Sequence, residues 1–243
     1  MLKKIVFVFT AVLMSAGMFA LTPRTGDVWD ADTHTLTIHG DPGTDGYNIA
    51  KEEIEHLVVG IEVDTISNYA FATCTNLHSI SFVPGSPLKT IGESAFYGTA
   101  VTSLQFPDAF TTLRTTAFAY CAHLTSVVFP AGTTTIGYSA FENCDALVTV
   151  TIYADALTEY GEYAFHDCNI LAYIYVPNES VATYKAGWAA YEEKIKALSD
   201  KPTGIDQTAA DTHAAKFIRE GQLFIRRDGR TFTLTGQAVD IAE

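Results

Sequence analysis

The apolar residues in the middle of the chain follow a repeating pattern. Five Ala-Phe pairs recur at nearly constant intervals, with their phenylalanines 25, 22, 23 and 24 residues apart. These phenylalanines are Phe71, Phe96, Phe118, Phe141 and Phe165. A large apolar or aromatic residue stands five positions before each of them, and a triplet spaced apolar-x-x-apolar-x-apolar follows, such as Leu77, Ile80 and Phe82. Self-similarity at a period of 20 to 50 residues is the signature of a solenoid or another repeat architecture.

Each triplet predicts one short β-strand, because its last two apolar residues alternate with polar or small ones. A proline follows closely at Pro84, Pro107, Pro130 and Pro177. Proline has no backbone donor and therefore ends the strand. One copy cannot bury its own apolar face, so we expect residues 54–177 to stack into a repeat solenoid with a short parallel sheet. The phenylalanine and triplet columns would form its core.

Two flanking segments are predicted to cap this solenoid. Within residues 18–53, the segments 28–30 and 35–40 have the pattern of two strands joined by a polar turn, which predicts an N-terminal β cap. Over residues 178–199 the apolar positions change to a helical period, which predicts a C-terminal helical cap with Asn178 as its N-cap. Its aromatic side chains are also of the type that forms sugar platforms. An open solenoid needs a cover at each end, which favours the cap for both segments.

The last part of the chain differs from the repeats. Residues 200–212 are polar and indicate a linker. Residues 213–243 contain two turn signals, Glu220-Gly221 and Asp228-Gly229, between alternating segments. This pattern predicts a small β-meander.

The N-terminus indicates export. Lys3 and Lys4 precede an apolar run and then small residues up to Gly17, as in a secretory signal peptide over residues 1–17, with cleavage as late as residue 20 as the alternative. The apolar run is too short to span a bilayer. The formal charge of the chain is -13, which argues against nucleic acid or an anionic membrane as partner. We therefore expect a protein without a membrane span that is secreted or lies at the outer cell surface.

The repeat resembles the BspA-like leucine-rich repeats of bacterial surface proteins, which have the pattern I-G-x-x-A-F-x-x-C-x-x-L. Residues 91–96 and 136–147 follow that pattern most fully. The resemblance implies surface exposure and, as in some members of the family, adhesion to host or bacterial partners, but it implies no fixed binding residue. The C-terminal segment is similar to the sorting tails of proteins exported by the Bacteroidetes type IX system, although it is shorter. A sorting signal and an accessory hairpin both stay open.

The four cysteines, Cys74, Cys121, Cys144 and Cys168, each stand three residues after a repeat phenylalanine. In the second copy we expect Gly98 to hold that place. Equivalent residues on adjacent rungs lie about 4.8 Å apart, whereas a disulfide needs Cβ atoms about 3.8 Å apart. The pattern therefore favours a buried column of reduced cysteines over disulfides or a metal site.

The sequence gives no sign of catalysis. It has no H-E-x-x-H, G-x-S-x-G, C-x-x-C or Gly-rich phosphate loop. Its histidines occupy different positions of the repeat, so they form no column. We expect neither an enzyme nor a cofactor or metal.

Binding is the function that remains, and the strand residues opposite the core are its candidates. They are mostly small and hydroxylated, but Gln105, Tyr153, Tyr173 and Tyr175 give this face a polar and aromatic part. Aromatic residues are enriched at interfaces, although they also simply suit strands. The predicted function is adhesion or another protein–protein contact with an extracellular partner. A glycan-binding accessory protein and a structural surface component are the alternatives.

Overall fold

The computed structural model describes residues 26–42 and 51–202, together with the backbone of four strands between residues 214 and 239. The chain divides into two compact units, Met1–Ser199 and Asp200–Glu243. The predicted signal peptide lies outside the described residues, as does most of the predicted linker.

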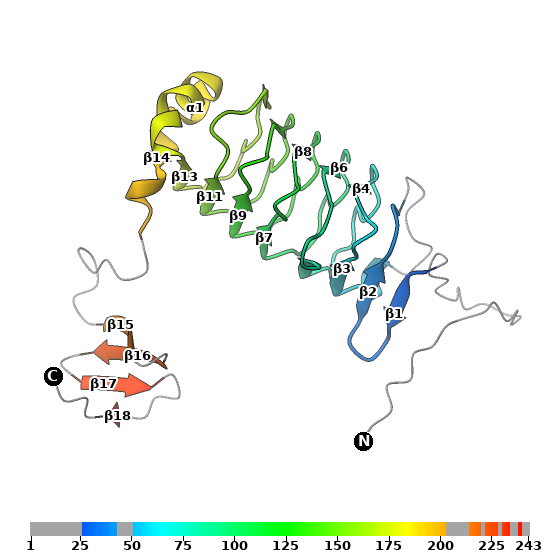
Figure 1. Cartoon of the computed structure of the whole chain (residues 1–243), viewed down its shortest axis with the longest axis horizontal. Coiled ribbons are helices and arrows are strands. Elements are labelled where there is room, and N and C mark those ends of the chain that lie inside the picture. Colours follow the sequence, from blue (N-terminus) through cyan, green and yellow to red (C-terminus); the bar gives the residue numbers. More distant parts are fainter. Residues whose placement is uncertain are drawn as a thin grey trace, which may run out of the picture. The chain divides into compact units, whose positions relative to one another are not determined.

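The first unit is a solenoid whose long strands follow the predicted triplets (Figure 1). These strands are β3 (His56–Val59), β5 (Ser79–Phe82), β7 (Ser103–Gln105), β9 (Ser126–Phe129), β11 (Thr149–Ile152) and β13 (Tyr173–Val176). Neighbouring long strands pair in parallel, as β3 with β5 and β9 with β11, except for β5 and β7. The prediction of a repeat solenoid with one such strand per copy is confirmed.

Each complete repeat also contributes a two-residue strand, which forms a second parallel sheet along the other side of the solenoid (Figure 1). These strands are β4 (Thr65–Ile66), β6 (Thr90–Ile91), β8 (Thr112–Leu113), β10 (Thr135–Ile136) and β12 (Glu159–Tyr160). They contain the large residue that stands five positions before each phenylalanine. Two residues are too few to show an alternating pattern, so the sequence did not predict them.

The Ala-Phe segments form a third column, which we call the turn ladder. Their backbones bond from rung to rung, as in Phe71 N–H to Ala95 O at 2.8 Å and Phe118 N–H to Ala140 O at 2.9 Å. In every rung the residues two before and two after the phenylalanine have positive φ, between 50° and 68°. They are Tyr69, Ser94, Thr116, Ser139 and Tyr163 on one side, and Thr73, Gly98, Tyr120, Asn143 and Asp167 on the other. The repeat therefore uses the left-handed conformation with side chains that seldom adopt it.

The five repeat phenylalanines stack along the axis of the core. Successive ring centroids lie 5.3, 4.9, 5.9 and 5.7 Å apart, with the ring planes within 10° of parallel. The alanines before them are also buried. A larger side chain in place of alanine would separate the rungs of the turn ladder, which explains why the two residues occur as a pair.

All four cysteines are buried and free. The thiols of Cys121, Cys144 and Cys168 donate to the carbonyl oxygens of Phe96, Phe118 and Phe141 at 3.2, 3.2 and 3.0 Å. The expectation that Gly98 holds the place of the missing cysteine is wrong, because Gly98 lies one position early. Thr99 takes that place, with its Oγ1 3.3 Å from Cys121 Sγ.

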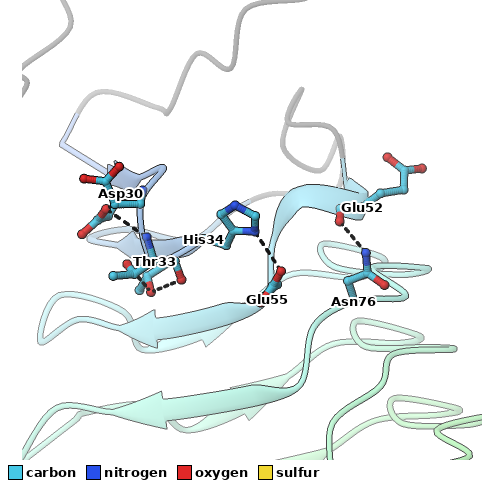
Figure 2. Close-up of polar contacts among 8 residues, drawn as sticks. Asp30, Thr33, His34, Glu52, Glu55 and Asn76 are labelled. Atoms are coloured by element: carbon cyan, nitrogen blue, oxygen red, sulfur yellow. Dashed lines mark hydrogen bonds and ion pairs between the residues drawn. The ribbon is translucent and has the colours of Figure 1, made fainter.

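The N-terminal cap is a hairpin of β1 (Val28–Asp30) and β2 (Thr35–Ile38), and β2 pairs in parallel with β3. Asp30 Oδ1 accepts hydrogen bonds from two backbone amides of the turn. Figure 2 shows how the cap joins the first repeat: His34 Nδ1 lies 2.8 Å from Glu55 Oε1, next to the short 3-10 helix Lys51–Glu53. From the next rung Asn76 donates to Glu52 O at 2.7 Å.

The C-terminal cap is less helical than predicted. A 3-10 turn (Asn178–Ser180) leads into α1 (Val181–Gly187), and a second 3-10 segment (Ala189–Lys194) leads into β14 (Ile195–Ala197) and a last 3-10 turn (Leu198–Asp200). The residue at the N-cap of α1 is Ser180, not Asn178. Asn178 instead accepts a hydrogen bond from the Ser199 amide at 3.1 Å. β14 pairs in parallel with β13, so a strand completes the sheet where helix was expected.

The second unit is the predicted β-meander. Its strands β15 (Ala214–Arg219), β16 (Gln222–Arg227), β17 (Arg230–Thr233) and β18 (Ala238–Val239) pair antiparallel in chain order.

Candidate binding surfaces

The predicted strand face does not form one compact site. Gln105, Tyr153 and Tyr173 are exposed, as expected. Gln105 and Tyr173 lie on strands separated by β9 and β11. Tyr153 follows the end of β11, whereas Tyr173 is in register with Thr149 at the start of that strand.

Tyr175 is buried, with only 3% of its surface exposed, so the expectation that it faces solvent is wrong. Because β14 completes the sheet, Tyr175 lies between Thr151 on β11 and Lys196 on β14 rather than on an edge strand. The ring of Tyr173 also lies 5.5 Å from that of Tyr175.

The sheet of long strands has one break, between β5 and β7. Strands β1, β2, β3 and β5 form one ladder, and β7, β9, β11, β13 and β14 form another. The two ladders touch at one end, where Thr102 N–H donates to His78 O at 3.2 Å, but β5 and β7 are not paired along their length. Two strand edges therefore face each other unpaired.

This break opens the core to solvent. Every inward residue on the other long strands is buried, whereas Ile80 and Phe82 of β5 are partly exposed. A cleft of about 550 Å³ lies there, with Ile80, Phe82 and Phe106 on its apolar side and Ser103 and Gln105 on its polar side. Asp108 is the one ionisable side chain among the residues that line it. We call it the β5–β7 cleft.

Unequal repeat lengths explain the cleft. The phenylalanines on either side of β5 are 25 residues apart, the longest spacing, and those on either side of β7 are 22 apart, the shortest. The extra residues form a turn after β5, in which Ser86 N–H donates to Val83 O at 3.0 Å and Gly85 has φ of 74°. The unequal spacings are the feature of the sequence that could have predicted the partial exposure of Ile80 and Phe82. The repeat pattern alone predicts that both are core residues like their equivalents in the other copies.

The aromatic residues of the C-terminal cap serve packing. Tyr184 and Trp188 are buried, with Tyr184 OH donating to Ala154 O at 2.9 Å and Trp188 Nε1 to Gly161 O at 3.1 Å. The Phe165 amide donates to Tyr191 OH at 3.1 Å. The burial of Tyr184 and Trp188 and their hydrogen bonds to backbone carbonyls favour a capping role over a sugar platform for these two residues.

The cysteine column carries no sign of reactivity at Cys74. Burial raises the pKa of this thiol from 9.0 to about 12, so it stays protonated and poorly nucleophilic. Within residues 26–42 and 51–202 no group of three His, Cys, Asp or Glu side chains has the arrangement of a metal site. No helix in the part of the chain that the structure describes is long and apolar enough to cross a membrane.

Comparison with known proteins identifies the repeat. The profile described as BspA type leucine rich repeat region matches residues 47–193 in six copies, the number given by five complete copies and the incomplete first one. No curated protein matches the chain.

Several solved structures are similar. The leucine-rich repeat protein TpLRR of T. pallidum is 27% identical with a TM-score of 0.49, and the alignment covers 64% of this chain and 71% of that one. The pneumococcal vaccine antigen PcpA is 13% identical with a TM-score of 0.41, over 74% of this chain and 34% of the antigen. A leucine-rich repeat protein from Bacteroides ovatus is 20% identical with a TM-score of 0.29, over 60% and 54%. The chain thus spans about a third of the length of the pneumococcal antigen.

Proposed function

Since the chain belongs to the BspA-type leucine-rich repeat family, we propose that it is a binding protein that recognises a protein partner at the cell surface, in adhesion or a related contact. No catalytic activity, cofactor or metal is part of this proposal.

The β5–β7 cleft is the observation that carries the proposal. It combines partly exposed apolar side chains, Ile80 and Phe82, with two strand edges that are not paired to each other. An exposed strand edge is a template for another chain, and protein segments bind in this way by adding a strand. Apolar contacts give such a complex affinity, while Ser103 and Gln105 at the rim supply polar groups for recognition.

Export and surface attachment complete the proposal. The basic and apolar pattern of residues 1–17 supports secretion, and the segment that forms β15 to β18 resembles a sorting tail, although it is shorter. Deleting residues 217–243 tests the tail. We expect the full chain to be accessible to protease on intact cells and the truncated chain to be retained inside. Unchanged surface accessibility would eliminate the sorting role.

Glycan binding is the second candidate, because the solenoid offers aromatic side chains elsewhere. Tyr153 and Tyr173 are exposed, and a cleft of about 720 Å³ beside the C-terminal cap is lined by Tyr160, Tyr191 and Asn169 among others. Rings and amides of this kind also suit sugars.

A parallel screen separates the candidates. The full chain is tested against a panel of extracellular proteins and a glycan array, and its mass in solution is measured. The proposal predicts a protein ligand. A ligand found only on the glycan array would favour the second candidate, and self-association without any ligand would favour a structural surface component.

A matched pair of variants then locates the site. Ser103→Arg places a long side chain in the β5–β7 cleft. Thr149→Arg makes the same charge change at the equivalent position two strands away, because Ser103 and Thr149 are both in register with Ser126 of β9. We expect the first variant to weaken binding at least tenfold and the second to leave it within about twofold, since blocking a central contact typically costs ~2 kcal/mol. Equal effects would place the site elsewhere.

A further inference from the structure

Among the residues that the structure describes, most of the exposed tyrosines lie on the turn ladder and not on the strand face from which binding was predicted. Tyr120, Tyr138 and Tyr163 are 49%, 47% and 44% exposed. Tyr97 is partly exposed beside Tyr120. The second to fifth turn segments contribute one of these tyrosines each, at different positions before and after the phenylalanine, so the hydrophobic repeat does not mark them.

These side chains lie as two pairs on neighbouring rungs of the turn ladder. The rings of Tyr97 and Tyr120 lie 5.1 Å apart, and those of Tyr138 and Tyr163 lie 5.5 Å apart. His166 lies beside the second pair and beside Glu142, because its ring is 5.3 Å from that of Tyr163 and its Nδ1 is 4.0 Å from Glu142 Oε1. The Tyr120 amide in turn donates to Glu142 O at 2.7 Å. We call Tyr97, Tyr120, Tyr138, Tyr163, Glu142 and Glu162 the tyrosine–glutamate patch.

The surroundings of the patch are acidic. The turn segments 67–75, 92–100, 114–122, 137–145 and 161–169 contain five carboxylates, Glu93, Glu142, Asp145, Glu162 and Asp167, and one basic residue, Arg114. The charge of Glu162 raises the pKa of the Tyr163 hydroxyl. Burial raises the pKa of Tyr97, and Tyr120 and Glu142 raise it further. The tyrosine rings therefore lie in a negative potential.

The backbone holds this surface in place. Three backbone hydrogen bonds join each pair of neighbouring turns, as between the second and third rungs, where Ser94, Phe96 and Gly98 donate to Thr115, Ala117 and Ala119. A surface on such a ladder is preformed, so binding orders little of the protein.

We propose that the tyrosine–glutamate patch is a second interaction surface, which binds a lysine- or arginine-rich segment of a partner protein. An ammonium or guanidinium group over an exposed tyrosine ring gains a cation–π contact, and Glu142 and Glu162 add the opposite charge beside it. The net charge of -13 repels an acidic ligand from the same place. This inference does not depend on the β5–β7 cleft, which lies in the sheet of long strands.

The test uses the full chain and two fluorescent ten-residue peptides, one of five Lys-Ser repeats and one of five Glu-Ser repeats, in an anisotropy titration. The lysine peptide is expected to bind saturably, and more weakly as sodium chloride rises from about 50 to 500 mM because salt screens exposed charges. The glutamate peptide is expected not to bind. Equal binding of the two peptides, or no saturable binding of the lysine peptide, overturns the proposal.

Backbone-compatible variants locate the effect. Tyr120→Asn and Tyr163→Ser each introduce the residue that the fourth rung carries at the equivalent left-handed position, Asn143 and Ser139. The control is Tyr153→Ser with Tyr173→Thr, which removes two similarly exposed tyrosines from the strand face. The protein that carries both Tyr120→Asn and Tyr163→Ser is expected to lose at least about fivefold in affinity for the lysine peptide. The control is expected to stay within about twofold, and the melting temperatures of both proteins are expected to stay unchanged. Equal losses would overturn the proposal.

Discussion

Thr99 Oγ1 lies 3.3 Å from Cys121 Sγ, at the place that a cysteine holds in the neighbouring rungs. Cys121 donates to Phe96 O at 3.2 Å, as Cys144 and Cys168 donate to Phe118 O and Phe141 O, and the Thr99 hydroxyl continues this column of small buried groups. This position therefore requires a small side chain that can form a weak hydrogen bond, and it does not require a thiol.

Substitution of Thr99 tests that interpretation. Thr99→Ala removes a buried side chain and is expected to lower the free energy of unfolding by about 1–2 kcal/mol. Thr99→Cys keeps a hydrogen-bonding group of similar size and is expected to lower the free energy of unfolding clearly less than Thr99→Ala does. Urea denaturation of both variants measures the difference, and equal losses would show that the hydrogen-bonding group does not matter.

The cysteine column predicts a specific thiol count. Because all four cysteines are buried and free, a thiol reagent at neutral pH is expected to label none of them in the folded protein and all four after unfolding without reductant. Fewer than four labelled thiols in the unfolded protein would reveal a disulfide.

The raised pKa of Cys74 predicts a loss of stability in alkali. The pKa is about 12 in the folded protein and 9.0 for the reference thiol. Its contribution is therefore fully present below pH 9 and is lost as the pH rises toward 12, by about 1.4 kcal/mol per unit because only the unfolded thiol ionises. Cys74→Ala lacks this contribution. The stability difference between the two proteins should shrink above pH 9, and a constant difference would contradict the assignment.

Gly98 tests the left-handed turns. Its φ is 68°, and a Cβ there would meet no atom within 4 Å, so conformation alone decides the cost of a side chain. Gly98→Ala is expected to destabilise the protein by about 1 kcal/mol. Gly98→Asn, which introduces the residue of the fourth rung, is expected to cost less because asparagine tolerates this conformation. Thermal unfolding compares them, and no loss with alanine would argue against the assigned φ.

The sequence predicted the long strands well because their apolar residues alternate and a proline follows closely. It predicted the C-terminal cap less well, since Ile195 has helical spacing from Tyr184 and Trp188 but reaches the core from a strand. Helix α1 ends at Gly187, where a Cβ would lie 2.5 Å from the Tyr160 ring. No pattern within one segment shows such a contact between segments.

The candidate surfaces were predicted less completely than the fold. Gln105 was found from its place opposite the core, but Tyr175 was misplaced because β14 was not foreseen. The β5–β7 cleft arises from the mismatch of two repeat lengths, and the tyrosine–glutamate patch arises from variable positions of the turns. Both depend on how neighbouring rungs differ, whereas the repeat pattern shows only what they share.

Amide hydrogen exchange of the free protein tests the central claim, the break between β5 and β7, most directly. The Val83 amide bonds to Val59 O on the β3 side, and the Phe106 amide bonds to Val128 O on the β9 side. Successive amides of a strand in a parallel sheet point to opposite sides, so the amides of Ile80, Phe82 and Gln105 point toward the break. We expect these three amides to exchange much faster than those of β9 and β11, which are paired on both sides. Uniformly slow exchange through β5, β7, β9 and β11 would mean that the sheet is continuous and the cleft does not exist.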